Sequence, residues 1–249
     1  MRALKETGER FSVAAPRYDE HAHIQRSLAM ELAQRVCVRP GDVVADVGTG
    51  TGSLLNALKA KEPGAVYVGI DAAEGMLAVA QGLRVCADQS RLPFKPESFD
   101  LVVSSSCYHW SPDLTAAFSG ATRVLKFNGR FEAVLFGKET MDELFISLGA
   151  VSPVLAERLG RMPRLPSLDA VRTALSLSGF TTFDVKREIR RERFGSIRDV
   201  LYWLRETGTN GLGKGIFIGK DALFRSGEYF SKSFDGEVSF EVIWLTAGK

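Results

Sequence analysis

The sequence predicts an α/β fold, in which helices cover both faces of a mostly parallel β-sheet. Short apolar segments rich in β-branched residues recur along the chain, segments with helical spacing separate them, and a glycine-rich turn follows the first of them. The 249 residues are enough to bury a sizeable core, and a content of 45% hydrophobic and 25% charged residues is ordinary for a globular protein.

The amino-terminal half begins with a helical segment and continues with alternating strands and helices. Apolar residues at helical spacing lie within residues 11–36, and Pro40 and Gly41 end that segment. Beyond it the sequence predicts strand Val43–Val47, helix Ser53–Lys61, strand Val66–Asp71, helix Gly75–Gln81, strand Leu83–Asp88, strand Phe99–Ser105, helix Leu114–Leu125 and, after a turn at Asn128 and Gly129, strand Arg130–Phe136.

The carboxyl-terminal half adds two strands and several helices, which brings the predicted sheet to seven strands. We expect one domain over residues 1–249, with a lid helix at about 10–36, a core at about 37–138 and a substrate-side insertion within about 139–249. The predicted elements of this half are helices Met141–Leu148, Leu168–Leu177 and Ser196–Glu206 with Ser196 as N-cap, strands Phe180–Ile189 and Val238–Leu245, and a glycine-rich loop at Gly208–Gly215.

Composition narrows the classes of function. The formal net charge of +2 gives a weak overall field, so the chain is not expected to bind nucleic acid. Its three cysteines are far apart and its histidines form no ligand pattern, which favours a reducing cytoplasm and no metal site. No apolar run approaches the ~20 residues that cross a membrane.

The glycine turn carries the first functional signal. Gly48, Gly50 and Gly52 follow the first predicted strand, where ligands of open α/β sheets bind. Their spacing is G-x-G-x-G, and Ser53 stands where a dinucleotide-binding pattern would have its last glycine. Asp46 lies two residues before the turn, and a carboxylate there suits a cationic ligand better than a pyrophosphate.

Two further acids lie at the ends of the next two predicted strands. Asp71 can accept both hydroxyls of a ribose, and Asp88 can accept from the exocyclic amine of an adenine. Asp46 could hold an amino-acid ammonium through water. A strand-end aspartate can also simply cap the next helix. Together the three acids predict a site for S-adenosylmethionine, whose product is S-adenosylhomocysteine.

These motifs resemble those of class I S-adenosylmethionine-dependent methyltransferases, which have a Rossmann-like fold. The matching segments are DVGTGTG at Asp46–Gly52, GID at Gly69–Asp71, ADQSRLPF at Ala87–Phe94, SFDLVVSSSCYHW at Ser98–Trp110 and LKFNGRF at Leu125–Phe131. On this basis the expected cofactor contacts are Gln25, Asp46, Gly48, Gly50, Gly52, Asp71, Ala72, Met76, Asp88, Gln89 and Ser104.

The two ends of the chain are similar to the malonyl-acyl carrier protein O-methyltransferases of biotin (pimelate) synthesis, the BioC family. RFSVAAPRYDEHAHIQR at Arg10–Arg26 matches the amino-terminal segment of that family, and WLRETGTNG at Trp203–Gly211 matches a helix end. Thr207–Thr209 departs from the Ile-Gly-Ala of the family. The resemblance implies methylation of the free carboxylate of a malonyl thioester, and a final antiparallel strand inserted beside the fifth.

The implied reaction needs no general base, because a carboxylate is already ionised near neutral pH. Catalysis would consist of aligning the reacting atoms and excluding water. We expect Tyr18 and Arg205 to be catalytic, with Arg205 holding the malonyl carboxylate, although a helix-end arginine can also be merely solvated. His109 and Trp110 would contact the substrate, or pack as an aromatic pair.

The expected partner is an acyl carrier protein or coenzyme A thioester, and the chain is expected to be a monomer. The basic segment Lys186–Arg193 could attract an acidic carrier protein, or protect an edge strand with charge. Other acceptors, such as a quinone, an amine or a phenol, and a non-catalytic binding role remain alternatives.

Overall fold

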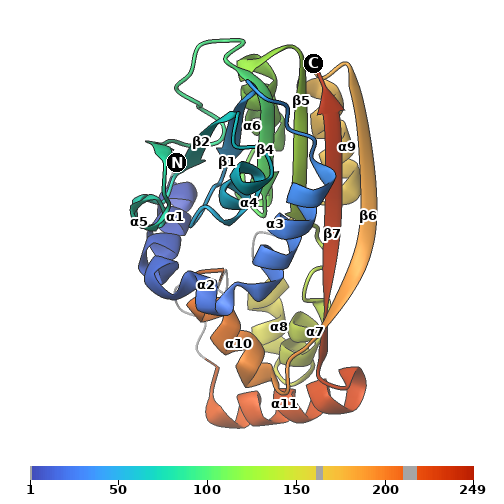
Figure 1. The fold of residues 1–249 in the computed structure, drawn as a ribbon. Coiled ribbons are helices and arrows are strands. Elements are labelled where there is room, and N and C mark those ends of the chain that lie inside the picture. The colour runs from blue at the N-terminus through green and yellow to red at the C-terminus, as the bar shows by residue number, and fades with distance from the viewer. Residues whose placement is uncertain (1, 161–164, 210–217) are drawn as a thin grey trace.

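The computed structural model describes residues 2–160, 165–209 and 218–249 and contains a sheet of seven strands in the order β3-β2-β1-β4-β5-β7-β6 (Figure 1). All neighbouring pairs are parallel except those of β7, which runs antiparallel between β5 and β6. The strands are β1 Val43–Val47, β2 Val66–Asp71, β3 Leu83–Cys86, β4 Phe99–Ser105, β5 Leu125–Phe136, β6 Thr182–Arg193 and β7 Glu237–Gly248. The predicted fold class and the insertion of the last strand beside the fifth are confirmed.

Helices cover both faces because side chains alternate along each strand. Val44 of β1 joins the apolar core beneath α3 and α4, whereas Ala45 joins the core beneath α6 and α9. The helices and helical turns are α1 Arg2–Ala14, η1 Ala15–Arg17, α2 Tyr18–His21, α3 His23–Arg35, α4 Ser53–Lys61, α5 Glu74–Val79, η2 Tyr108–Trp110, α6 Leu114–Val124, α7 Asp142–Ala150, α8 Pro153–Gly160, α9 Leu168–Leu177, α10 Ile197–Glu206 and α11 Lys220–Phe234.

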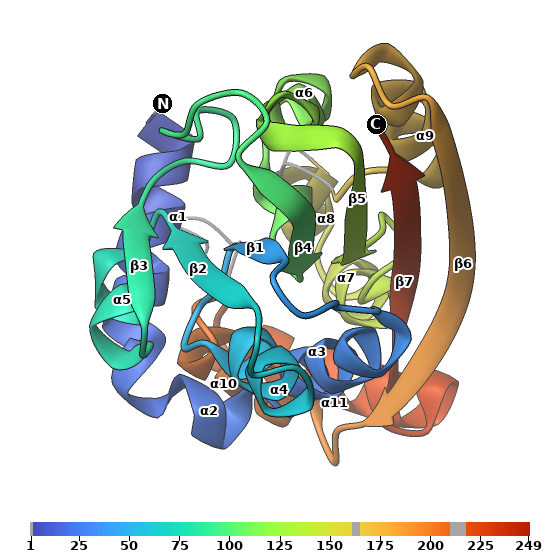
Figure 2. The ribbon, with the colours of Figure 1, turned by 45° about the horizontal axis from the view of Figure 1, so that its top comes forward.

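The helices α7, α8, α10 and α11 gather beyond the carboxyl ends of the parallel strands, and α1 and α2 lie beside the same end (Figures 1 and 2). None of the helices in the described ranges is long and apolar enough to cross a membrane. The carboxyl ends of the parallel strands face this layer of helices. The glycine turn lies at the same end of the sheet.

Three predicted elements differ from the structure. The helical segment at 11–36 is interrupted by η1 and broken again at Ala22, where the His21 carbonyl accepts from Trp203 Nε1 at 2.9 Å and stabilises the break. β5 begins at Leu125, and Asn128 with its φ of 62° lies inside the strand, because a register shift against β4 accommodates the Asn-Gly pair. β6 continues to Arg193 because it pairs with the whole of β7.

Helices α8 and α11 were not predicted, nor was the part of α1 before residue 11. The predicted N-cap of α10 is confirmed, since Ser196 Oγ accepts from the Asp199 backbone N–H at 3.3 Å. Most of the predicted loop at Gly208–Gly215 lies outside the described residues.

Candidate functional site

The glycine turn lies in the centre of the sheet, at the carboxyl end of β1. β1 pairs with β2 on one side and with β4 on the other, so the turn is at the topological switch point of the fold. Gly48, Gly50 and Gly52 have φ values of 78°, 55° and 92°. The backbone N–H groups of Gly48 and Thr49 donate to the Ile70 carbonyl at 2.7 and 3.0 Å, which holds the turn against β2.

Two cavities flank this turn. The first cavity is lined by Thr7, Gly8, Phe11, Tyr18, Val47, Gly48, Gly50, Asp71, Ala72, Ala73, Met76, Ala87, Gln89, Ser105, Ser106, Cys107 and Trp110. The second cavity is lined by Tyr18, Asp19, Ala22, Gln25, Arg26, Ala29, Asp46, Gly48, Thr49, Gly50, Thr51, Ser53, Leu54, Ser105 and Ser106. Both cavities share Tyr18, Gly48, Gly50, Ser105 and Ser106, so they meet at the carboxyl ends of β1 and β4.

The structure brings most of the predicted cofactor residues to these cavities. Those that line the first cavity are Gly48, Gly50, Asp71, Ala72, Met76 and Gln89. Gln25 and Asp46 line the second cavity. Of the predicted catalytic and substrate residues, Tyr18 lines both cavities and Trp110 lines the first.

Asp71 ends β2 and faces the first cavity with a carboxylate that is already oriented. Its Oδ2 accepts from the Gly50 backbone N–H at 2.9 Å, and its Oδ1 accepts from Ala73 N–H at 2.8 Å. Burial raises the pKa of Asp71, and these backbone hydrogen bonds oppose that rise. Each carboxylate oxygen has a further lone pair, so Asp71 can still accept hydrogen bonds from the hydroxyls of a ribose.

Asp46 of β1 lines the second cavity and is only 1% exposed. Neither of its carboxylate oxygens accepts a hydrogen bond from the described part of the chain. Burial raises the pKa of Asp46 to about 7; the neighbouring Thr49 hydroxyl opposes this rise, and the charge of Asp71 adds to it. A cationic ligand beside this carboxylate would favour its ionised form, and the carboxylate would in turn bind the cation.

Further buried polar atoms around the two cavities have no hydrogen-bond partner among the described residues. Buried polar groups in folded proteins almost always have one, so such a cluster points to a polar ligand. The atoms are Gln25 Oε1, Thr49 Oγ1, Gln89 Nε2, Ser105 Oγ and Ser106 Oγ. A ribose, an adenine and an amino-acid zwitterion supply donors and acceptors for this set, so the residues fit the S-adenosylmethionine predicted from the sequence.

Helices α1 and α2 form a lid over the first cavity. Phe11 packs edge-to-face on Trp110, with ring centroids 5.6 Å apart. A Cβ at Gly75 of α5 would lie 2.6 Å from Ser12 Cα, and the Gly75 N–H donates to Ser12 Oγ at 3.2 Å, so the absence of a side chain lets α1 approach α5 closely. The lid thus rests on α5 and presents Tyr18 to both cavities.

A side-chain hydrogen bond joins the lid to the glycine turn, since Thr51 Oγ1 donates to Asp19 Oδ1 at 2.7 Å. We expect Thr51→Val to weaken S-adenosylhomocysteine binding about fivefold, because one such bond contributes about 1 kcal/mol. Amide exchange should also quicken in α1 and α2. Ser98→Ala, which removes a hydrogen bond far from the lid, is the control. Unchanged exchange in the lid would show that this bond does not hold it.

Three predicted cofactor residues lie outside both cavities because their groups serve the protein itself. Asp88 Oδ1 accepts from the Ser90 backbone N–H and hydroxyl at 2.8 and 2.9 Å, so it shapes the turn after β3. Ser104 is fully buried and donates to the Val47 carbonyl at 2.6 Å. Gly52 is the N-cap of α4. Gln89, the residue after Asp88, lines the first cavity instead of Asp88.

His109 also lies outside both cavities. It is 7% exposed, packs on Phe136, and its Nδ1 accepts from the Phe136 backbone N–H at 3.3 Å. Burial lowers the pKa of His109 to about 3, so the ring is neutral near pH 7. In the structure His109 has the packing contacts that were the alternative to a substrate contact.

Arg205 does not line either cavity. Its side chain is 66% exposed, forms an ion pair with Glu206 at 2.8 Å and stacks over Tyr202 at 5.0 Å. It borders a separate hollow that residues of α1 and α10 line, and the other charged residues there are Arg10, Arg17, Glu6, Glu9 and Glu206. In this arrangement the guanidinium is not beside the junction of the two cavities, where the predicted pairing with a malonyl carboxylate would place it.

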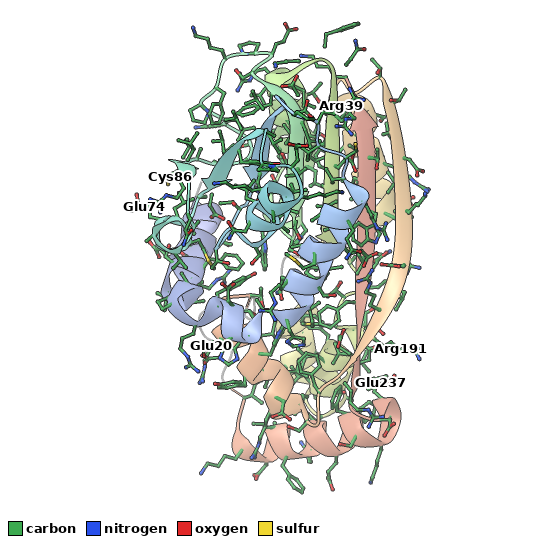
Figure 3. The ribbon with its side chains drawn as sticks, viewed as in Figure 1. Glu20, Arg39, Glu74, Cys86, Arg191 and Glu237 are labelled. Atoms are coloured by element: carbon green, nitrogen blue, oxygen red, sulfur yellow. The ribbon has the colours of Figure 1, made fainter. Side chains whose placement is uncertain are left out.

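The predicted basic segment is the edge strand β6, and its cations have acidic partners. Arg187 pairs with Glu241 at 2.6 Å and Arg190 with Glu31 at 2.6 Å. The other pairs are Lys186 with Asp184, Arg191 with Glu237 and Arg193 with Asp235. Figure 3 shows Arg191 and Glu237 near the α11 end of the β6–β7 ladder. These pairs neutralise the segment, which favours its role in protecting the sheet edge.

Several lining residues were missed from the sequence. Thr7 and Gly8 belong to the part of α1 that was not predicted. Ser105 and Ser106 follow the predicted Ser104 directly, and the φ of 56° at Ser106 is a conformation that sequence spacing does not reveal. Arg26 is adjacent to the predicted Gln25, and helical geometry could have placed both on one face. No group of metal-ligating side chains occurs within the described residues.

Comparison with known proteins agrees with these features. A family model described as a methyltransferase domain matches residues 45–133. The malonyl-[acyl-carrier protein] O-methyltransferase of Geobacter sulfurreducens is 34% identical over 187 residues, which is 70% of each chain. That of Gallionella capsiferriformans is 30% identical over 96% of this chain and 88% of the relative. The biotin biosynthesis bifunctional protein BioHC of Saccharophagus degradans is 32% identical to this chain. The matched region covers 82% of this chain and 38% of that longer relative.

Solved structures share the fold. A protein from Bacillus halodurans, described as a methyltransferase, superposes with a TM-score of 0.63 at 21% identity, over 90% of this chain and 99% of that one. The Haemonchus contortus phosphoethanolamine N-methyltransferase 2 in complex with S-adenosyl-L-methionine gives 0.58 at 19% identity, over 90% of this chain and 52% of that one.

Proposed function

Because the chain belongs to the malonyl-[acyl-carrier protein] O-methyltransferase family, we propose that it methylates the free carboxylate of a malonyl thioester, with S-adenosylmethionine as methyl donor, in biotin (pimelate) biosynthesis. The observation that carries this proposal is the chemistry of the junction between the two cavities. Of the five residues that both cavities share, Tyr18 is the only one with an ionisable side chain. A reaction at this junction would therefore depend on positioning of the reacting groups more than on abstraction of a proton.

The cofactor would lie across both cavities. We place its adenosine in the first cavity, where Asp71 accepts from the ribose, and its methionine part in the second cavity beside Asp46. When bound, S-adenosylmethionine supplies an activated methyl group on its sulfonium. Phe11 and Trp110 pack at the first cavity, where they help to exclude water from the reacting atoms.

The side chains near the junction keep their protons. Burial raises the pKa of Tyr18, so its hydroxyl donates hydrogen bonds and is not a base. Burial also raises the pKa of the Cys107 thiol, which excludes a thiolate at neutral pH. The acceptor carboxylate is itself ionised near neutral pH. Tyr18, Ser105 and Ser106 would then hold it by hydrogen bonds in line with the methyl group.

The acceptor class is tested by measuring S-adenosylhomocysteine release with a panel of acceptors. We expect turnover with malonyl-acyl carrier protein and none with acetyl-acyl carrier protein, which has no free carboxylate. Malonyl-coenzyme A in the same panel identifies the thioester carrier. The position of Arg205 outside both cavities is the reason to include a quinone, a phenol and an amine. Turnover with one of these alone would contradict the proposed acceptor.

We propose that Arg205 contacts the acidic carrier rather than the malonyl carboxylate, because its side chain is largely exposed and lines neither cavity. Arg205→Ala is expected to raise the KM for malonyl-acyl carrier protein a few-fold and to leave cofactor affinity unchanged. The effect should shrink at high salt, since rim charges act mainly on encounter. The matched comparison is Arg191→Ala on β6. An equal loss of cofactor affinity would refute this role for Arg205.

We also propose that the enzyme acts as a monomer in the cytoplasm. Its three cysteines, Cys37, Cys86 and Cys107, are free, which is usual in a reducing compartment. Sedimentation at several protein concentrations tests the monomer.

A further inference from the structure

Among the described residues that line the two cavities, Arg26 is the only lysine or arginine. It lines the second cavity from α3, and its side chain is exposed. Ala22, Gln25, Arg26 and Ala29 lie on one face of the helix, because residues three and four positions apart are neighbours. Figure 2 shows α3 close to α4, which follows the glycine turn.

The guanidinium of Arg26 has no ion pair or hydrogen bond within the described residues. Nearby arginines differ in this respect. Arg17 pairs with Glu20 and Glu206, and Arg35 pairs with Glu31. The charged groups that line the second cavity with Arg26 are Asp19 of α2, which accepts from Thr51, and Asp46 of β1.

The second cavity therefore combines an exposed cation with a buried acid. Asp46 is 1% exposed and Gln25 is 6% exposed, and their oxygens accept no hydrogen bond within the described part of the chain. An α-amino acid presents an ammonium and a carboxylate on the same carbon. Asp46 and Gln25 can accept from the ammonium, and a guanidinium can donate two parallel hydrogen bonds to the carboxylate.

We propose that Arg26 binds the α-carboxylate of the methionine part of the cofactor. This inference rests on the proposed function, because it takes S-adenosylmethionine as the ligand. The rival ligand for Arg26 is the malonyl carboxylate. The cofactor is favoured because Arg26 lines the cavity of Asp46 and is not one of the residues at the junction, where the acceptor must approach the methyl group.

The test compares two ligands by isothermal titration calorimetry. S-adenosylhomocysteine carries the amino-acid part, whereas 5′-methylthioadenosine lacks it. Arg26→Gln is expected to weaken S-adenosylhomocysteine binding about tenfold or more, since charge-assisted hydrogen bonds are the strong ones, and to leave 5′-methylthioadenosine binding unchanged. Arg35→Gln, on the same helix but paired with Glu31, should change neither affinity.

Two results would overturn the proposal. Equal weakening for both ligands would mean that Arg26 acts on the fold of the lid. Unchanged S-adenosylhomocysteine affinity with a raised KM for the malonyl thioester would assign Arg26 to the acceptor. If the wild-type chain binds S-adenosylhomocysteine and does not methylate malonyl thioesters, the proposed acceptor fails while the assignment of Arg26 is still decided by the two-ligand comparison.

Discussion

Gly48→Ala is expected to abolish cofactor binding and to destabilise the protein strongly. A Cβ at Gly48 would lie 2.2 Å from Cys107 Cβ and 2.4 Å from its Sγ, and the φ of 78° is unfavourable for any L-residue. The backbone conformation costs roughly 1–2 kcal/mol and the overpacking a further 1–3 kcal/mol. To relieve this contact, the glycine turn would have to move, and both cavities meet at that turn.

Two other variants separate these causes. Gly41→Ala has a φ of 85° with no atom within 4 Å of the new Cβ, so it should show the backbone cost alone in urea unfolding. Adding Cys107→Gly to Gly48→Ala removes the clashing side chain and should restore part of the stability. Gly48→Ala protein as stable as Gly41→Ala, with cofactor affinity intact, would show that the turn tolerates a side chain.

Asp46→Asn is expected to remove cofactor binding while stabilising the free protein at high pH. The folded state holds the Asp46 proton more tightly than the unfolded chain, because its pKa is raised from 3.8 to about 7. This stabilising contribution is complete below about pH 4 and is lost as the pH rises through 7. Ionised Asp46 therefore destabilises the free fold by up to about 4 kcal/mol at pH 8.

The asparagine carries no charge at any of these pH values. Urea unfolding should show the variant about 2–4 kcal/mol more stable than the wild type at pH 8 and within about 1 kcal/mol of it at pH 4. Calorimetry with S-adenosylhomocysteine should show at least a hundredfold loss of affinity, because the ammonium loses its carboxylate. A stability difference that is the same at both pH values would mean that ionisation of Asp46 does not destabilise the free fold.

The parallel core of the fold could be predicted because its strands are short, apolar and separated by clear turns. Ser53–Lys61, Val66–Asp71 and Phe99–Ser105 have the predicted bounds. The sequence was less informative where tertiary contacts determine where a helix or strand ends. The break at Ala22 depends on a bond from Trp203, a residue far along the chain. The length of β6 depends on its pairing with β7, since its alternating charges alone resemble a solvated segment.

The site was predicted best where a motif fixes the backbone. Asp46, Gly48 and Asp71 follow from the strand ends and line the cavities. Asp88 and Asp71 look alike in sequence, but one caps a local turn and the other faces the first cavity. The resemblance predicted that Arg205 holds the substrate, whereas its side chain on α10 is 66% exposed and lines neither cavity. Such differences depend on side-chain direction, which spacing does not encode.

Intact-mass spectrometry of malonyl-acyl carrier protein tests the central claim most directly. After incubation with the enzyme and S-adenosylmethionine, the malonyl carrier should gain the mass of one methylene group. Acetyl-acyl carrier protein should be unchanged. An unchanged malonyl carrier, with an enzyme that binds S-adenosylhomocysteine in the same buffer, would contradict the assignment of the malonyl carboxylate as the acceptor.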